Sequence, residues 1–157
     1  MIEIERKFLI KGDFLPYVTR KEQIVQAYMC GSKERTVRVR IKGEKAYLTI
    51  KGPSDDGEFS RMEFEYEIPV EDATGMLKFC MPGFIEKVRH YIPCGKHTYE
   101  VDVFHGVNEG LVFAELELDS KEEDFIKPDW VGEEVTGDIR YYNSYIVKHP
   151  FKQINYS

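Results

Sequence analysis

The amino-acid sequence predicts an α+β, mainly β fold, in which strands curl into a barrel with a charged lumen and helices pack outside it. Seven segments of the chain carry charged residues two positions apart, and the residues between them are largely apolar. Residues two apart in a β-strand point to the same face, so each segment has one charged and one apolar face. Several charged pairs have the same sign, as in Arg38-Val-Arg40 and Glu115-Leu-Glu117. Such neighbours lie roughly 7 Å apart and repel each other unless something offsets the repulsion.

An open sheet with a salt-bridged, water-facing side is the alternative architecture. A solvated sheet face normally mixes Thr, Ser and Gln with charges of alternating sign, and the like-charge pairs depart from that pattern. A barrel with the charged face inside therefore fits the sequence better, and it would suit a strongly anionic ligand bridged by divalent metal. The lumen would gather the cations Lys7, Arg38, Arg40, Lys51, Arg61, Lys87 and Arg89, and the carboxylates Glu3, Glu5, Glu63, Glu65, Glu100, Asp102, Glu115 and Glu117.

Alternation bounded by turn residues predicts eight strands along the chain. They cover about 2–10, 23–30, 35–42, 45–51, 59–68, 85–92, 97–104 and 112–119. A helix is expected from Val70 to Phe79, because two acidic residues stand in its first turn and apolar residues follow at helical spacing. A second short helix is expected near 121–125. A last helix is expected over 138–148, ended by Pro150.

Length and composition indicate one globular domain. The 157 residues suffice for a proper core, and 42% hydrophobic with 32% charged residues is typical of a soluble protein. The net charge of −6 argues against a general nucleic-acid binder, because non-specific binding needs a basic surface. The cations are nevertheless concentrated on the strand faces, so the distribution of charge is a better guide to the ligand than its sum.

Cysteine usage and hydropathy favour a cytoplasmic protein. Cys30, Cys80 and Cys94 form no C-x-x-C pair, so we expect free thiols in a reducing compartment rather than a zinc site or disulfides. No apolar run approaches the roughly 20 residues of a membrane span, and the chain starts with charged residues rather than a signal peptide, so no membrane partner is expected. The apolar outer face exceeds what two helices would cover, which favours a homodimer.

The opening Glu3-Ile-Glu5-Arg-Lys7 resembles the E-x-E-x-K signature of the CYTH superfamily, the triphosphate tunnel metalloenzymes. This superfamily also includes class IV adenylate cyclases and thiamine triphosphatases. Later paired motifs follow in the family's order, and residues 132–143 resemble its closing segment. The resemblance covers essentially the whole chain. It implies a single CYTH domain over 1–157, with an eight-stranded antiparallel tunnel that binds a triphosphate and Mg²⁺ or Mn²⁺.

The resemblance also implies roles for individual residues. Phosphate oxygens would be bound by Lys7, Arg38, Arg40, Lys51, Lys87 and Arg89. Divalent metal would be held by Glu3, Glu5, Glu115 and Glu117, with Asp102 as a further candidate. Glu63 and Glu65 would serve a second metal or orient its water, and so count as catalytic. The alternative role of each carboxylate is a salt bridge to a cation of the lumen.

Tyr28 resembles the tyrosine that pairs with the signature lysine in short bacterial triphosphatases. A phenol close to Lys7 could aim the ammonium group at a phosphate oxygen, which makes both residues candidates for catalysis. The alternative is an aromatic side chain that fills the barrel wall.

The preferred interpretation is a metal-dependent hydrolase that splits inorganic tripolyphosphate, or a related triphosphate, into a diphosphate product and phosphate. Two alternatives remain open from the sequence. One is an adenylate cyclase that makes cyclic AMP and pyrophosphate, which would need a nucleoside pocket at one tunnel mouth. The other is a module that binds polyphosphate or nucleotide without turnover.

Overall fold

The computed structural model of the chain describes residues 2–31, 34–54 and 60–151. Its strands are β1 (Ile2–Ile10), β2 (Arg20–Gly31), β3 (Thr36–Lys42), β4 (Lys45–Ser54), β5 (Ser60–Ile68), β6 (Ile85–Cys94), β7 (His97–Phe104), β8 (Val112–Leu118) and β9 (Val131–Glu134). Strands β1 to β8 correspond to the eight predicted strands, with ends that differ by a few residues.

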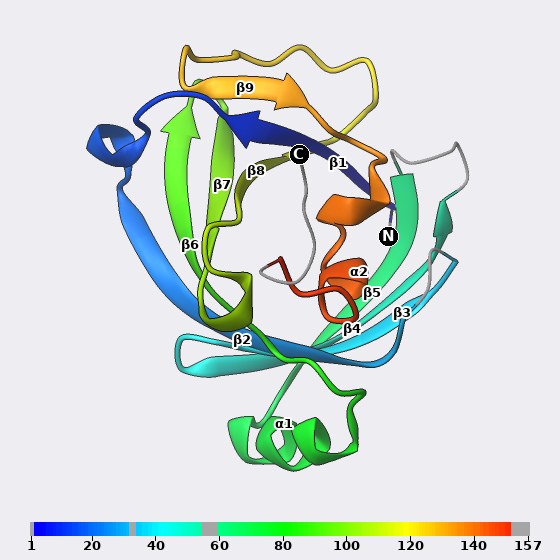
Figure 1. The fold of residues 1–157 in the computed structure, drawn as a ribbon. Helices are drawn as coiled ribbons and strands as arrows, with labels where there is room; N and C mark the ends of the chain where they lie inside the picture. The colour runs from blue at the N-terminus through cyan, green and yellow to red at the C-terminus, as the bar shows by residue number, and fades with distance from the viewer. Residues whose placement is uncertain (1, 32–33, 55–59, 152–157) are drawn as a thin grey trace.

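The strands pair antiparallel in the order β5-β4-β3-β2-β6-β7-β8-β1, and the sheet closes because β1 also pairs with β5 (Figure 1). The prediction of an eight-stranded antiparallel barrel is therefore confirmed. Strand β9 is an addition that the sequence did not predict, and it pairs with the end of β1 near Phe8 and Ile10. Its four residues are too short a run to show alternation.

Cross-strand pairing determines which side chains face the lumen. Lys7 lies opposite Glu115, and Arg89 lies opposite Asp102. Directly opposed residues share one face of a sheet, so this register brings the charged sets of neighbouring strands to the same side. That side is the interior of the barrel, as the like-charge pairs predict.

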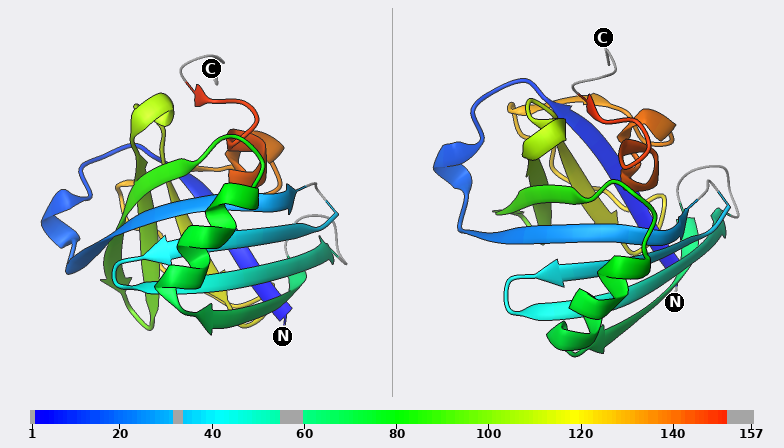
Figure 2. Two further views of the ribbon diagram at one scale, coloured as in Figure 1. Left: turned by 90° about the horizontal axis from the view of Figure 1, so that it is seen from below. Right: turned by 60° about the horizontal axis from the view of Figure 1, so that its bottom comes forward.

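Helix α1 (Val70–Met76) and a 3-10 turn (Leu77–Phe79) pack against the outside of the barrel (Figure 2). Ala73 of this helix is fully buried, in a cluster with Val39 of β3 and Ala46 of β4. The small side chain lets the helix approach the strands closely. The predicted outer helix between the fifth and sixth strands is confirmed.

The chain from 119 to 130 covers the outer face of β1, β7 and β8 without forming the helix predicted near 121–125. Phe125 and Trp130 pack there against Phe8, which is almost completely buried. The helix prediction was wrong because Glu123 accepts a hydrogen bond from the backbone N–H of Asp119 at 2.8 Å, which stabilises a turn. Side-chain to backbone bonds of this kind compete with helix formation.

The C-terminal segment differs most from expectation. In place of one helix over 138–148, a 3-10 turn (Ile139–Tyr141) and helix α2 (Asn143–Ile146) are separated by an extended residue. The segment lies across one end of the barrel (Figure 1), where fully buried Ile146 belongs to one cluster with Phe104 and Phe113. It therefore closes that end, whereas the prediction put the helix on the outside. Among the described residues, no helix combines the length and apolar character needed to cross a bilayer.

Candidate active site

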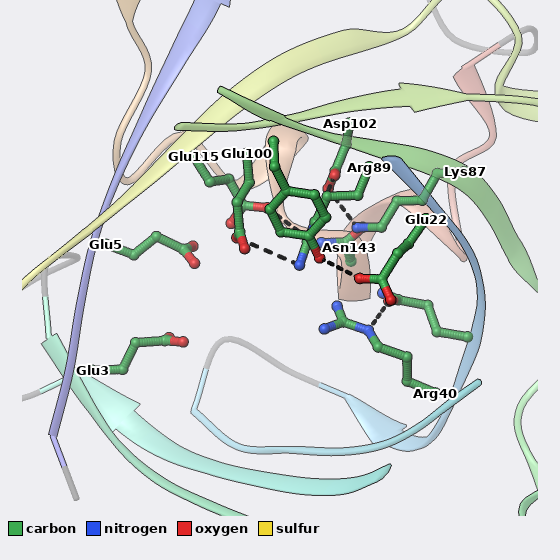
Figure 3. A network of polar contacts seen from close by, with 12 residues as sticks. Glu3, Glu5, Glu22, Arg40, Lys87, Arg89, Glu100, Asp102, Glu115 and Asn143 are labelled. Carbon is green, nitrogen blue, oxygen red and sulfur yellow. Dashed lines mark hydrogen bonds and ion pairs between the residues drawn. The ribbon is translucent and has the colours of Figure 1, made fainter. Parts of the chain in front are cut away.

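The charged faces of the strands surround a cavity of about 210 Å³ inside the barrel. Most of the predicted site residues line it: Glu3, Glu5, Lys7, Tyr28, Arg38, Arg40, Lys51, Glu63, Glu65, Arg89, Glu115 and Glu117. The predicted residues Lys87 and Asp102 lie outside this lining and are almost completely buried. Side chains from neighbouring strands, such as Glu5 of β1 and Glu115 of β8, point toward the same space (Figure 3).

Asp102 holds two cations in place from behind the cavity wall. Its carboxylate accepts two hydrogen bonds from Arg89, at 2.8 and 2.9 Å, and lies 2.7 Å from Lys87 Nζ (Figure 3). Burial alone would raise the pKa of Asp102, but Arg89 and Lys87 hold that pKa well below its usual range. Both oxygens are thus engaged by cations, which is the alternative role that the sequence left open for each carboxylate.

Arg40 is a buried cation with a single polar partner among the described residues. Its Nε donates to Gln26 Oε1 at 2.7 Å. Burial, together with repulsion from Arg38 and Arg89, lowers the pKa of Arg40 to about 9. A guanidinium with unpaired N–H groups beside other cations requires an anion, and a phosphate oxygen would meet that requirement.

Arg38 lies beside Arg40 in the same strand and is only partly paired. One terminal nitrogen donates to Thr49 Oγ1 at 3.2 Å and lies 3.6 Å from Glu65 Oε2. Its Nε is buried and has no hydrogen-bond partner among the described residues. Glu65, which also accepts from Thr49 at 2.8 Å, is half exposed at the edge of the cavity. This part of the cavity therefore has more cationic donors than acceptors.

The opposite excess occurs around Glu117. Burial, together with repulsion from the nearby carboxylates Glu3, Glu63 and Glu100, raises the pKa of Glu117 to about 7 against the opposing effect of Lys51. Lys51 is shared, at 2.8 Å from Glu3 and 3.6 Å from Glu63. Several carboxylates thus compete for one ammonium group, an excess of negative charge that a divalent cation could neutralise.

A second excess of negative charge occurs where Glu115 and Glu5 lie close together. Burial raises the pKa of Glu115, and repulsion from Glu5 raises it further, while Lys7 at 4.0 Å lowers it. In the part of the chain that the structure describes, no three acidic, histidine or cysteine side chains converge closely enough to hold an ion as they stand. The donor chemistry nevertheless fits Mg²⁺ or Mn²⁺, because carboxylate oxygens are their preferred ligands.

Lys7 and Tyr28 both border the cavity near its closed end. Lys7 Nζ donates to the backbone oxygen of Tyr141 at 2.8 Å and lies 4.8 Å from the ring of Tyr142. Tyr28 is 4% exposed and belongs to the apolar cluster at that end. Across the described ranges, no hydrogen bond joins Lys7 to the Tyr28 hydroxyl. The C-terminal segment, rather than Tyr28, orients the lysine here.

Sequence reasoning missed several residues of the cavity wall. Lys42, Thr36 and Thr49 line it, and each lies in i, i+2 register with a predicted residue, so the alternation could have found them. Tyr142 and Asn143 also line it, and Asn143 Oδ1 accepts from Lys87 at 3.2 Å. These two come from the closing segment, whose irregular backbone has no periodicity to indicate which side chains face inward.

The closed antiparallel barrel and its charged interior cavity are the features expected of a triphosphate tunnel protein, and comparison with known sequences agrees. Residues 1–144 match the CYTH domain family. The chain belongs to this family. It is 47% identical over 151 residues to an inorganic triphosphatase of Acetivibrio thermocellus, with 96% of each chain covered. It is 34% identical to an inorganic triphosphatase of Nitrosomonas europaea, with 91% of this chain and 95% of that protein covered.

Solved structures share the fold. One described as an inorganic triphosphatase is 29% identical and has a TM-score of 0.61. The alignment covers 92% of this chain and 93% of that one. Another, from Hippeastrum, is described as an adenylyl cyclase candidate with a dominant triphosphatase activity. Its TM-score is 0.60 over 76% of this chain and 81% of that one, and its 16% identity supports likeness of fold alone.

Proposed function

We propose that this chain is an inorganic triphosphatase, which hydrolyses tripolyphosphate to diphosphate and phosphate. The observation that carries the proposal is the division of one closed-ended cavity into two parts. Among the described residues, one part has buried arginines with N–H groups that lack partners, and the other has carboxylates that outnumber the nearby ammonium groups. A polyphosphate with bound divalent metal would neutralise both. The activity of the two curated relatives supports the same reaction.

In this proposal the cations bind and orient the substrate. Arg38 and Arg40 donate to phosphate oxygens in fork geometry, and Lys7 and Lys51 contribute point charges. Arg89, whose fork binds Asp102, adds its positive charge at the cavity wall, and Lys87 adds its charge from behind that wall. Asp102 keeps Arg89 and Lys87 in position. These groups neutralise the charge that develops on the leaving diphosphate when a P–O–P bond breaks.

The carboxylates would hold Mg²⁺ or Mn²⁺. Glu3, Glu5, Glu115 and Glu117 are the ligands we propose, since Glu5 raises the pKa of Glu115 and Glu3 raises that of Glu117 by repulsion between like charges. Such an ion supplies a Lewis acid for phosphate oxygens and favours ionisation of an attacking water. Glu63 and Glu65 lie at the edge of the same cavity and would orient that water and accept its proton.

The lining of the cavity disfavours the cyclase alternative. The described lining residues are charged or hydroxyl-bearing, apart from Gly137 and Asn143. The aromatic residues among them, Tyr28 and Tyr142, lie at the end that the C-terminal segment closes. No apolar slot for an adenine ring is present among them. A small, highly charged inorganic substrate therefore fits better than a nucleotide.

The experiment is to incubate the purified protein with Mg²⁺ or Mn²⁺ and either tripolyphosphate or ATP, and to separate the products by chromatography. We expect rapid release of phosphate and diphosphate from tripolyphosphate and slow or absent turnover of ATP. Cyclic AMP formation with tripolyphosphate left intact would instead establish the cyclase. Binding of both compounds without any product would establish a non-catalytic module.

We also propose that the protein is a homodimer formed through the outer face of β4 and β5. Ile2, Ile50, Met62, Phe64 and Tyr66 are exposed there, from 39% to 57%. The register places Ile2 beside Met62 and Ile50 beside Phe64, so they form one patch. Exposed apolar patches of a few hundred Å² mark interaction sites. The outward-facing residues of both strands are uncharged, so a second copy meets no like-charge repulsion.

For location, we propose the cytoplasm. Cys30, Cys80 and Cys94 are all free thiols. Free cysteines of which one is exposed are typical of a reducing compartment. Cell fractionation with an antibody against the protein would test this.

A further inference from the structure

Gln26 is a polar residue of the barrel interior that neither the charge pattern nor the cavity lining singles out. It lies on β2, directly opposite Arg40 of β3, and its side chain is completely buried. Its neighbours on the same face of β2 are Ile24 and Tyr28, both buried as well. A buried amide must find partners for an oxygen and for an NH₂ group.

The orientation of this amide is determined by its partner. Arg40 Nε, at 2.7 Å, can only donate a hydrogen bond, so the group facing it must be the amide oxygen of Gln26. The NH₂ group consequently points elsewhere, and rotating the amide by half a turn would oppose two donors. The Nε2 atom has less than 1 Å² of exposed surface and no hydrogen-bond partner among the described residues.

The surroundings contain donors in place of the missing acceptor. Arg40, whose other N–H groups have no polar partner in the described part of the chain, borders the cavity. Lys87, opposite the neighbouring Ile24, is also a donor. A buried donor without an acceptor is destabilising and calls for an explanation. An incoming group that only accepts hydrogen bonds could receive one from the Gln26 NH₂ group and another from Arg40.

We propose that Gln26 is a substrate-binding and positioning residue of the triphosphate site. Its amide oxygen fixes the plane of the Arg40 guanidinium, and its NH₂ group donates to a phosphate oxygen that Arg40 also binds. This inference rests on the proposed function, because it requires a phosphate anion in the cavity. A neutral donor in this place adds a contact without adding to the repulsion among the arginines.

Two substitutions separate the functions of the two amide atoms. Gln26→Glu keeps an acceptor for Arg40 and loses the donor. In the ligand-free protein the new carboxylate would pair with Arg40, so we expect the melting temperature to rise while the Kd for tripolyphosphate increases. Gln26→Met removes both polar atoms without adding charge, and we expect its Kd to increase about ten- to a hundredfold, the effect of losing a hydrogen bond to a charged group.

Gln23→Glu is the matched control, because it makes the same change on the same strand at an exposed position of the opposite face. Neither its melting temperature nor its Kd should move. Binding is measured by calorimetry with tripolyphosphate and EDTA, so that turnover does not intervene, and KM and kcat are measured separately with metal. We expect the rise in KM to exceed the fall in kcat.

The outcomes are distinct. Wild-type Kd in a folded Gln26→Met protein would overturn the inference and leave the proposed function intact. A lower melting temperature for Gln26→Glu, with an unchanged Kd, would assign Gln26 a structural role only. Absence of tripolyphosphate binding by the wild-type protein would overturn the proposed function itself. A crystal structure with bound tripolyphosphate in which the Gln26 NH₂ group donates to water, rather than to phosphate, would overturn the inference about Gln26 but not the proposed function.

Discussion

Single residues of this cavity are arranged for a ligand at the expense of the ligand-free protein. Glu117 shows this most directly, because other carboxylates and burial raise its pKa to about 7. A carboxyl group whose pKa is raised by folding binds a proton more tightly in the native state. It therefore destabilises the native state as the pH rises from its ordinary pKa of 4.5 toward 7.

We expect Glu117→Gln to abolish most turnover while preserving or raising the melting temperature. The amide keeps the shape of the side chain and removes one charge from the repelling group. The stability gain over wild type should be small, because solvent still reaches part of the Glu117 side chain and screens the repulsion, and it should increase between pH 4.5 and 7. Thermal unfolding across this range without metal measures it. Wild-type activity in the folded variant would refute the metal-ligand assignment.

Arg40→Lys tests the fork geometry proposed for the arginines. The substitution retains a positive charge but loses the planar guanidinium and its bond to Gln26. We expect tripolyphosphate binding to weaken about tenfold or more, with little change in the metal requirement. Calorimetry measures the affinity. An unchanged Kd would mean that Arg40 contributes only its charge.

Tyr28→Phe isolates the phenol hydroxyl. The ring remains in the apolar cluster at the closed end, so packing is preserved. If Tyr28 acts on the substrate together with Lys7, kcat for tripolyphosphate should fall while the Kd and the melting temperature stay near wild type. Tyr17→Phe, at a residue that is 59% exposed, is the control. Equal rates for the two variants would make Tyr28 a wall residue.

At the scale of elements, the alternation of charged and apolar residues predicted the strands well. The same period of two residues identifies a strand and decides which of its side chains face the lumen. The same parity that makes Arg38 and Arg40 one like-charge pair, and Glu115 and Glu117 another, also places both pairs on the lumen face. Strand β9 was not predicted because its four residues are too few to show alternation. The C-terminal segment escaped it because apolar residues such as Tyr141 and Ile146 would fit an outer face or a closed barrel end equally well.

The closing segment is thus the element whose role only the structure reveals, and Ile146 tests it. This side chain is completely buried among aromatic residues from the lumen face. Ile146→Ala should reduce the free energy of unfolding by about 2–5 kcal/mol, through lost burial and the cavity left behind. It should also raise KM, since Tyr141 of this segment orients Lys7. Ile139→Ala, at an exposed position of the same segment, should change neither value.

For the whole molecule, the inverted distribution of charge has a second consequence. With the polar faces turned inward, apolar residues must be covered from outside, by α1 on β3 and β4 and by the chain from 119 to 134 on β1, β7 and β8. The patch formed by Ile2, Ile50, Met62, Phe64 and Tyr66 receives no such cover from the described residues. Phe64 and Tyr66 of β5 remain about half exposed there. The sequence indicated uncovered apolar surface, but not where it would lie, because that depends on which strands the loops and helices cross.

We therefore expect a concentration-dependent dimer that Phe64→Glu abolishes. A charge at the centre of the patch would be desolvated in each copy and would face its symmetry mate, so both terms oppose association. Phe79→Glu is the matched control, because Phe79 is 80% exposed on the turn that follows α1, outside the patch. Sedimentation velocity should show a monomer for Phe64→Glu and a dimer for wild type and for Phe79→Glu. Since the patch lies on the outer wall, turnover of tripolyphosphate by the monomeric variant should remain close to wild type, and a dimer that persists in Phe64→Glu would place the interface elsewhere.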